Sequence, residues 1–218
     1  MKNPLLSTKI LTPAQQELVL NTGIALTHYD ILKTESIVLK ETIIWDHVII
    51  TSKNAIPAIL PHLNRVKNIY CVGDQTAALL KENGLHPSYI ALNAADLAEE
   101  LTSNYSGENF YYLCSKQRRD ELPTFFLDKK IPLKEVFVYS SIAVMKSFDR
   151  IFAAIAFYSP RGVHAFAKAN PNNKPLIAVC IGETTASTAK LYFKNIAVAN
   201  KQTIENTLIT AIKALRND

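Results

Sequence analysis

The sequence predicts an α/β fold with two similar three-layer domains, each built around a mostly parallel sheet. Short runs of β-branched residues alternate with amphipathic stretches of helical spacing. An internal repeat relates the two halves of the chain, and 218 residues suffice for two cores of roughly 100 residues each. With 48% hydrophobic and 20% charged residues, the composition excludes disordered and low-complexity proteins.

Ten apolar or β-branched runs predict strands along the chain. They are residues 9–11, 27–32, 46–51, 68–72, 88–92, 109–114, 134–139, 154–159, 176–181 and 195–199. Stretches with apolar residues at helical spacing predict helices at 14–23, 52–63, 74–84 and 95–105. Because strands and helices alternate, we expect crossover connections and mostly parallel sheets, with helices on both faces.

The repeat relates DHVIITSKNAIPAIL to AIAFYSPRGVHAFAK, which places Ser52 opposite Ser159. It also relates IYCVGDQTAALLKENGL to IAVCIGETTASTAKLYF, which places Gly73 opposite Gly182. The N-terminal LSTKILTPAQQELV has its counterpart in LCSKQRRDELPTFF, in the middle of the chain. Two similar α/β units therefore share this sequence.

The order of these units predicts a discontinuous domain. We expect residues 1–31 and 144–218 to form one domain and residues 34–139 to form the other, inserted one. Linker strands near 32–33 and 140–143 would join them. Because two parallel linkers permit hinge bending but resist twisting, we expect an active-site cleft between the domains.

Polar turns follow several predicted strands and open the next helix. They contain Ser52, Gly73, Ser159 and Gly182. Each one alone is explained as an ordinary helix start, since glycine permits a tight turn and serine or threonine caps a helix. Four such turns at matching strand ends favour a site for anions, because free N–H groups at helix starts bind phosphate or carboxylate. None matches GxGxxG or GxxxxGK[ST], so nucleotide binding gains little support.

Other catalytic arrangements are missing from the sequence. The five histidines show no metal-ligand spacing, and Ser159 lies in YSPRG rather than in GxSxG. A basic cluster of Lys116, Arg118 and Arg119 follows the strand that ends at Cys114. It is interpreted either as a solvated helix start or as a clamp for a carboxylate.

Charge and cysteine content limit the partners and the compartment. A net charge of +5 suits an anionic partner but does not require nucleic acid. Cys71, Cys114 and Cys180 lie in apolar runs without a CxxC motif, which predicts buried, reduced thiols. The N-terminus lacks the apolar core of a secretory signal, and no apolar run is long enough to span a membrane. We therefore expect a cytoplasmic monomer that binds neither nucleic acid nor membranes.

Seven motifs taken together resemble the uroporphyrinogen-III synthase family. In chain order they are VIITSKNA, YCVGDQTAALLKENGLHP, CSKQRRDELP, VFVYSSIA, FYSPRGVHAF, AVCIGETTASTAK and TIENTLITAI. The resemblance implies a lyase of tetrapyrrole (haem) biosynthesis that needs no cofactor or metal. Its substrate would be hydroxymethylbilane, a linear tetrapyrrole rich in carboxylates, which the family cyclises with inversion of ring D and loss of water.

The resemblance also assigns site residues. By position, Tyr139 in VFVY falls at the family's active-site tyrosine, and a phenol could supply the proton needed for loss of hydroxide. The residues that fall at substrate-binding positions are Lys9, Thr51, Ser52, Ser115, Lys116, Ser159, Thr184 and Thr185. Two departures from the family stand out: Ser115-Lys116 replaces a frequent Gly-Asn, and Lys9 replaces an arginine with its bidentate fork.

Two other classes of protein remain open. A two-domain protein that binds small anions would share the hinge and the cleft, but such proteins usually work outside the cytoplasm. A non-catalytic relative that serves as an interaction module would keep the fold and lose Tyr139 or the paired Ser/Thr turns, all of which are present.

Overall fold

The computed structural model describes residues 3–39, 45–105 and 107–216. It divides into two compact units: unit 1 comprises Met1–Lys33 and Ile142–Asp218, and unit 2 comprises Thr34–Ser141. Each unit has its own sheet and its own buried clusters, so the predicted α/β fold class is confirmed. Among the described residues, no helix is long and apolar enough to cross a membrane.

The sheet of unit 1 has five strands, and every pairing in it is parallel. Across the sheet they are β11 (Ile196–Val198), β10 (Ile177–Cys180), β9 (Ala154–Phe157), β1 (Leu5–Ser7) and β2 (Leu26–His28). The first strand of the chain lies between β2 and a strand from the C-terminal half. This pairing makes the unit discontinuous in sequence.

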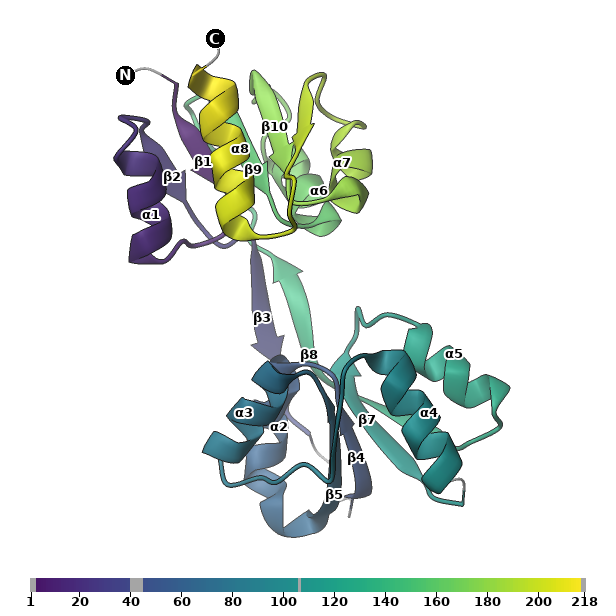
Figure 1. The fold of residues 1–218 in the computed structure, drawn as a ribbon. Coiled ribbons are helices and arrows are strands. Elements are labelled where there is room, and N and C mark those ends of the chain that lie inside the picture. The colour runs from purple at the N-terminus through teal and green to yellow at the C-terminus, as the bar shows by residue number, and fades with distance from the viewer. Residues whose placement is uncertain (1–2, 40–44, 106, 217–218) are drawn as a thin grey trace. The chain divides into compact units, whose positions relative to one another are not determined.

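Helices cover both faces of this sheet (Figure 1). They are α1 (Pro13–Leu20) and α8 (Ile204–Arg216) on one face, and α6 (Pro160–Ala169) and α7 (Glu183–Ala189) on the other. Phe166 of α6 is fully buried in one cluster with Phe157 of β9, and Leu208 of α8 is fully buried in another with Leu5 of β1. The burial of strand residues on both faces explains their continuous apolar runs.

The sheet of unit 2 has six strands. Across the sheet they are β3 (Leu32–Ser36), β8 (Leu133–Ala143), β7 (Phe110–Ser115), β4 (Trp45–Ile50), β5 (Val66–Val72) and β6 (Tyr89–Ala91). The pairings from β8 to β6 are all parallel. The predicted linkers at 32–33 and 140–143 lie within β3 and β8, respectively.

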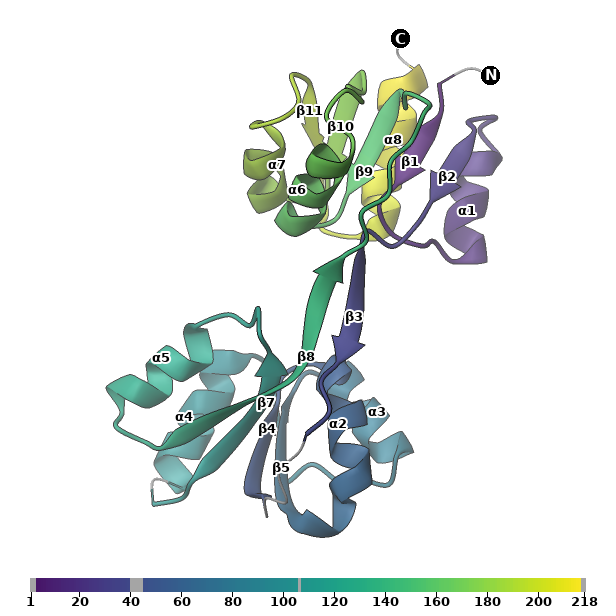
Figure 2. The same ribbon diagram turned by 180° about the vertical axis from the view of Figure 1, so that it is seen from behind.

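Unit 2 also has helices on both faces of its sheet (Figure 2). On one face are η1 (Lys53–Ala55), α2 (Ile56–Ile59), η2 (Leu60–Arg65) and α3 (Asp74–Glu82), and on the other are α4 (Ala94–Asn104) and α5 (Glu121–Asp128). The predicted helix at 52–63 is broken into three short pieces. Pro57 and Pro61 lie within it, and a proline in a helix interior removes a backbone hydrogen bond.

The structure corrects two strand predictions. Residues 9–11 are not a strand: β1 ends at Ser7, and the Ile10 N–H is bonded to the Asp30 carboxylate instead of a neighbouring strand. Ile10 is 57% exposed, whereas Leu5 and Leu6 are fully buried between β2 and β9. The stretch 27–32 contains only the end of β2 and the first residue of β3. Lys9 therefore lies just beyond the carboxyl end of β1.

The cysteine prediction is confirmed: Cys71, Cys114 and Cys180 are buried and free. Burial raises the pKa of the Cys71 thiol to about 11 and those of Cys114 and Cys180 to about 12. These thiols are protonated at neutral pH, so they pack as small apolar groups.

We predict that the two units have separable stabilities. Phe166→Ala should lower the free energy of unfolding of unit 1 by about 3–5 kcal/mol, because it opens a cavity in a buried aromatic cluster. Trp45, the single tryptophan, is buried in unit 2 and should report on that unit by fluorescence. In Phe166→Ala, the unfolding transition of unit 1 seen by circular dichroism should therefore shift to milder conditions than in the wild type. The transition seen by Trp45 fluorescence should not shift.

The matched control is Leu191→Ala, since Leu191 belongs to unit 1 but is 71% exposed. It should shift neither transition appreciably. Equal shifts of both signals in Phe166→Ala would show that the units unfold as one.

Candidate functional site

The predicted site residues of unit 2 gather at one edge of its sheet. Thr51 directly follows β4, while Ser115 ends β7 and pairs with Tyr139 of β8. Because β8, β7 and β4 are adjacent and parallel, the three residues lie on neighbouring strands at the carboxyl end. The sequence, which shows only spacing along the chain, could not order these strands.

Thr51 is held by a second hydroxyl. Its Oγ1 lies 2.9 Å from the phenol oxygen of Tyr112, which is buried on β7. Burial raises the pKa of Tyr112, the hydrogen bond to Thr51 opposes that rise, and Tyr139 adds to it electrostatically. Ser52 accepts a hydrogen bond from the Asn54 N–H and thereby caps η1.

Tyr139 combines a fixed backbone with an available hydroxyl. Its carbonyl accepts a hydrogen bond from the Lys116 N–H at 3.2 Å. Its half-buried ring packs against the core that contains Val138, and its hydroxyl has no hydrogen-bond partner among the described residues. The exposed Lys116 ammonium likewise has no partner within the described part of the chain. The Tyr139 hydroxyl and the Lys116 ammonium are therefore both available to a ligand.

The basic cluster next to this site is partly neutralised. Arg118 forms ion pairs with Glu135 and Asp120, including a 2.7 Å hydrogen bond from Nη2 to Glu135 Oε1. The guanidinium of Arg118 is therefore committed within unit 2. Lys116 and Arg119 lack side-chain partners among the described residues, so they are the cations of the cluster that remain for an anionic ligand.

Ser115 is committed to a neighbour. Its Oγ donates to Gln117 Oε1 and accepts from the Gln117 N–H, both at 3.0 Å. Ser115 is only 8% exposed. Its hydroxyl is better placed to hold this turn than to reach a ligand.

In unit 1, Lys9 and Ser159 line a pocket of about 220 Å³ at the carboxyl ends of β1 and β9, together with Thr8, Asp30, Ile31, Leu32 and Tyr158. The Lys9 ammonium has no partner among the described residues. Ser159 caps α6 by accepting from the Gly162 N–H at 3.1 Å. Of the predicted residues of unit 1, the structure brings these two together.

Thr184 and Thr185 lie in the first turn of α7, after β10, and they differ in exposure. Thr184 is exposed at the start of the helix, whereas Thr185 is only 3% exposed. In the repeat Thr185 corresponds to Thr76, which is also buried. The shared threonine of the two copies therefore faces the interior, and Thr184 is the one whose side chain is accessible.

Glycines open two of these helices without a side-chain cap. Gly73 precedes α3 and Gly182 precedes α7, and no side chain caps either helix. Gly73 has φ +81°, a conformation that L side chains rarely adopt. At Gly73, the start of α3 thus leaves backbone N–H groups near the carboxyl edge of the unit 2 sheet.

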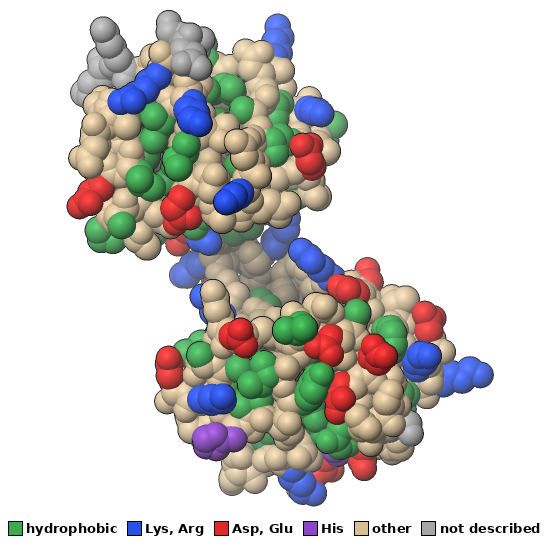
Figure 3. Space-filling view, viewed as in Figure 1, with side chains coloured by type: hydrophobic (Ala, Val, Ile, Leu, Met, Phe, Trp, Pro, Cys, Tyr) green, Lys and Arg blue, Asp and Glu red, His purple; other side chains and the backbone are tan. Residues whose placement is uncertain are grey.

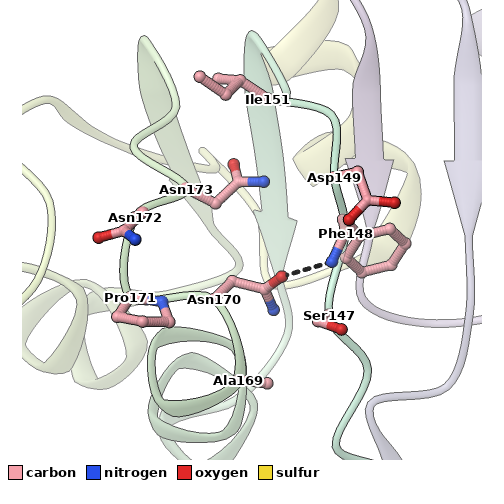
Figure 4. Close-up of a pocket in the computed structure, with 9 residues that line it drawn as sticks. All are labelled: Ser147, Phe148, Asp149, Ile151, Ala169, Asn170, Pro171, Asn172 and Asn173. Carbon is pink, nitrogen blue, oxygen red and sulfur yellow. Dashed lines mark hydrogen bonds between the residues drawn. The ribbon is translucent and has the colours of Figure 1, made fainter.

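Another pocket of unit 1, of about 330 Å³, lies at the amino end of β9 (Figure 4). There Asn170 accepts from the Phe148 N–H at 2.8 Å, and Asn173 donates to the Arg150 carbonyl at 2.8 Å. The two asparagines fasten the segment before β9 to the turn after α6. None of the predicted site residues lines this pocket.

Sequence reasoning missed three residues of these sites: Tyr112, Gln117 and Tyr158. Tyr112 and Tyr158 lie in strand-like runs, where aromatic residues read as core, and Gln117 lies inside the basic cluster. The groups that hydrogen-bond to the side chains of these three residues lie on other strands or turns. Only one sequence pattern pointed to Tyr112: in the strand NFYYLC, the two adjacent tyrosines must lie on opposite faces of the sheet.

Charged side chains form no uniform field on the visible face of unit 2, where acidic and basic residues are interspersed (Figure 3). Within the described ranges, no group of three or more His, Cys, Asp and Glu side chains is arranged to hold a metal ion. Hydroxyls, amides and lysines gather at these strand ends and suit carboxylates, and the Asp30 carboxylate lies among them, accepting a hydrogen bond from the Ile10 N–H.

Comparison with known proteins gives two kinds of match. A family model described as Uroporphyrinogen-III synthase HemD matches residues 24–208. The crystal structure of uroporphyrinogen-III synthetase from Helicobacter pylori 26695 has a TM-score of 0.69 at 17% identity, covering 98% of this chain and 100% of that one. A mutant uroporphyrinogen III synthase from the extremely thermophilic bacterium Thermus thermophilus has a TM-score of 0.60 at 15% identity, with coverages of 99% and 100%. At these sequence identities, the two solved structures support the fold of this chain and nothing further.

We predict that ionisation of the Tyr158 phenol lowers the stability of unit 1 at alkaline pH. Burial raises the pKa of its phenol to about 12, although a hydrogen bond with Ser7 opposes the rise. In the unfolded chain the value is about 10. The neutral phenol is thus favoured by folding, and its stabilisation is complete below pH 10 and lost as the pH rises towards 12.

The measurement compares the wild type with Tyr158→Phe by denaturant unfolding between pH 8 and 11. Above pH 10 the wild type should lose stability faster, by up to about 1.4 kcal/mol per pH unit. Parallel pH dependences would show that the phenol titrates alike in both states.

Proposed function

Because the chain belongs to the uroporphyrinogen-III synthase family, we propose that it is a lyase that cyclises hydroxymethylbilane to uroporphyrinogen III with inversion of ring D. The observation that carries this proposal is the family match over residues 24–208. The grouping of a phenol, hydroxyls and unpaired lysines at the sheet edges supports it.

The reaction needs orientation more than a strong nucleophile. The hydroxymethyl C–O bond breaks, and the oxygen leaves with a proton as water. The resulting carbon is attacked by the substituted position of ring D, which gives a spirocyclic intermediate, and fragmentation with reclosure inverts the ring. Uncatalysed closure gives the uninverted isomer, so the enzyme must hold ring D in the productive geometry.

The cations and helix starts of each unit account for binding of the polyanion. Lys9 in unit 1 and Lys116 in unit 2 lack partners among the described residues, so neither must break an ion pair there to meet a carboxylate. The start of α3 at Gly73 has no side-chain cap, so its N–H groups can bind another carboxylate of the substrate. Thr51, Ser52, Ser159 and Thr184 are the proposed hydroxyl contacts, while the buried Thr185 and the committed Ser115 support their turns.

Tyr139 is the proposed proton donor for loss of water. A phenol carries its proton at neutral pH, and general acid catalysis is typically worth about 10²–10⁴-fold in rate. The Tyr139 hydroxyl has no hydrogen-bond partner among the described residues, so it is free to donate a hydrogen bond to the substrate. Its backbone carbonyl accepts a hydrogen bond from the Lys116 N–H.

The protein's setting is also part of the proposal. We place it in the cytoplasm as a monomer that binds no nucleic acid, because its three cysteines are buried free thiols and its net charge is only +5. The ligand cleft that the sequence predicts remains a prediction. No observation favours the alternative of a non-catalytic anion-binding or interaction protein.

We predict that the purified protein, without added cofactor or metal, converts freshly made hydroxymethylbilane mainly to the type III isomer. The isomers are oxidised to porphyrins and resolved by chromatography, with a sample lacking enzyme as the control. A product mixture equal to that control would contradict the proposed function.

We predict that Tyr139→Phe lowers turnover by about 10²-fold or more and leaves the melting temperature nearly unchanged, because it removes the donor and keeps the ring.

Thr184→Ala and Ser52→Ala should each cost on the order of 1 kcal/mol in transition-state stabilisation, since each removes one hydroxyl. Steady-state rates and melting curves for the three variants test this. Full turnover by Tyr139→Phe would leave Tyr139 with a packing role only.

A further inference from the structure

The pairing of β7 with β8 changes register immediately before Tyr139. Cys114 pairs with Phe137, but the next residue of β7, Ser115, pairs with Tyr139. Val138 is therefore an extra residue on β8, which makes a β-bulge. The Val138 carbonyl is bonded to the Ile37 N–H at 2.8 Å, on the side of β3.

This bulge decides which face of the sheet Tyr139 occupies. In a regular strand, Val136 and Val138 would share one face, and Tyr139 would lie on the opposite face with Phe137. Instead Tyr139 packs against the same core cluster as Val136 and Val138, whereas Phe137 is 42% exposed. The extra residue turns the tyrosine side chain to the other face.

A side chain holds β8 in place beyond the bulge. The Lys116 N–H donates to the Tyr139 carbonyl at 3.2 Å, and in a continued parallel ladder the Ser141 N–H would bond to the next backbone carbonyl of β7. However, β7 ends at Ser115. The Ser141 N–H instead donates to Gln117 Oε1 at 3.0 Å.

The Ser115 hydroxyl orients this amide. Ser115 Oγ accepts from the Gln117 N–H, so its own hydrogen points to Gln117 Oε1 at 3.0 Å. Two hydrogens, one from Ser115 and one from Ser141, thus converge on a single carbonyl oxygen. Both groups are donors, which is consistent with oxygen rather than nitrogen at that position.

We propose that Gln117 is a positioning residue for Tyr139: its side-chain carbonyl replaces the missing backbone acceptor of β7 and holds the bulged segment of β8, so that the phenol is presented in one orientation. The catalytic part of this inference rests on the proposed function. The structural part, a clamp on residues 139–141, does not.

Gln117 is a suitable residue to mutate because it is exposed, so its truncation opens no cavity. Gln117→Ala removes the acceptor, whereas Gln117→Glu keeps an oxygen that can accept both hydrogen bonds. The matched control is Gln16→Ala, which removes a glutamine hydrogen bond to the Leu11 carbonyl in unit 1.

The first measurement uses no substrate. Amide hydrogen exchange of Ser141, followed by NMR, should be at least several-fold faster in Gln117→Ala than in the wild type. Gln117→Glu and Gln16→Ala should retain the protection. Unchanged protection of Ser141 in Gln117→Ala would overturn the clamp.

The second measurement is steady-state cyclisation of hydroxymethylbilane. Gln117→Ala should lower kcat roughly tenfold with little change in KM, because it misplaces the donor without removing a ligand contact. Gln117→Glu should restore kcat but raise KM, because it adds a negative charge beside Lys116 that repels the polyanion. Gln16→Ala should match the wild type.

A double mutant separates positioning of Tyr139 from a general structural effect. In a Tyr139→Phe background, Gln117→Ala should have little further effect on kcat, because no phenol remains to be positioned. An equal loss of kcat in both backgrounds would overturn the positioning role. If the wild type fails to cyclise the substrate, the proposed function fails, and hydrogen exchange still decides the clamp.

Discussion

Parallel strand pairing is the constraint on which both units depend. It brings the carboxyl end of each paired strand to a common edge, so every strand-to-helix turn there becomes a neighbour of the others. Thr51, Ser115 and Tyr139 come from distant parts of the chain and meet for this reason alone. The helices on both faces exclude water from the strands and leave that edge as the place for polar groups.

The charges at these edges follow from local pairing. Arg118 is held by Glu135 and Asp120, whereas Lys116 beside it has no partner among the described residues. An arginine committed to two carboxylates would lose those contacts before binding another anion, and a free lysine would not. The basic cluster is therefore divided between a part that stabilises unit 2 and a part that can meet a ligand.

Much of the fold was predictable from the sequence because apolar runs, helical spacing and the repeat are local patterns. The prediction was wrong where an exposed segment resembled a strand, as at residues 9–11. It was also wrong in treating residues 52–63 as one helix, although Pro57 and Pro61 are visible in the sequence and disfavour a helix interior. In the site, the positions of Ser159 and Gly73 follow from cap patterns. The hydrogen bonds of Thr51 with Tyr112 and of Ser141 with Gln117 could not be predicted, because they depend on strand register and on a bulge.

The two units share one plan and differ in what they can do chemically. Ser52 and Ser159 are equivalent in the repeat, and each caps the helix that follows its strand. Each unit also keeps a lysine without a partner among the described residues, Lys9 or Lys116, at its carboxyl edge. In contrast, the bulge that turns Tyr139 lies in β8, the strand through which the chain passes from unit 2 into unit 1. Anion binding can therefore be shared by the repeated turns, whereas the proposed proton donor depends on a feature that the repeat does not contain.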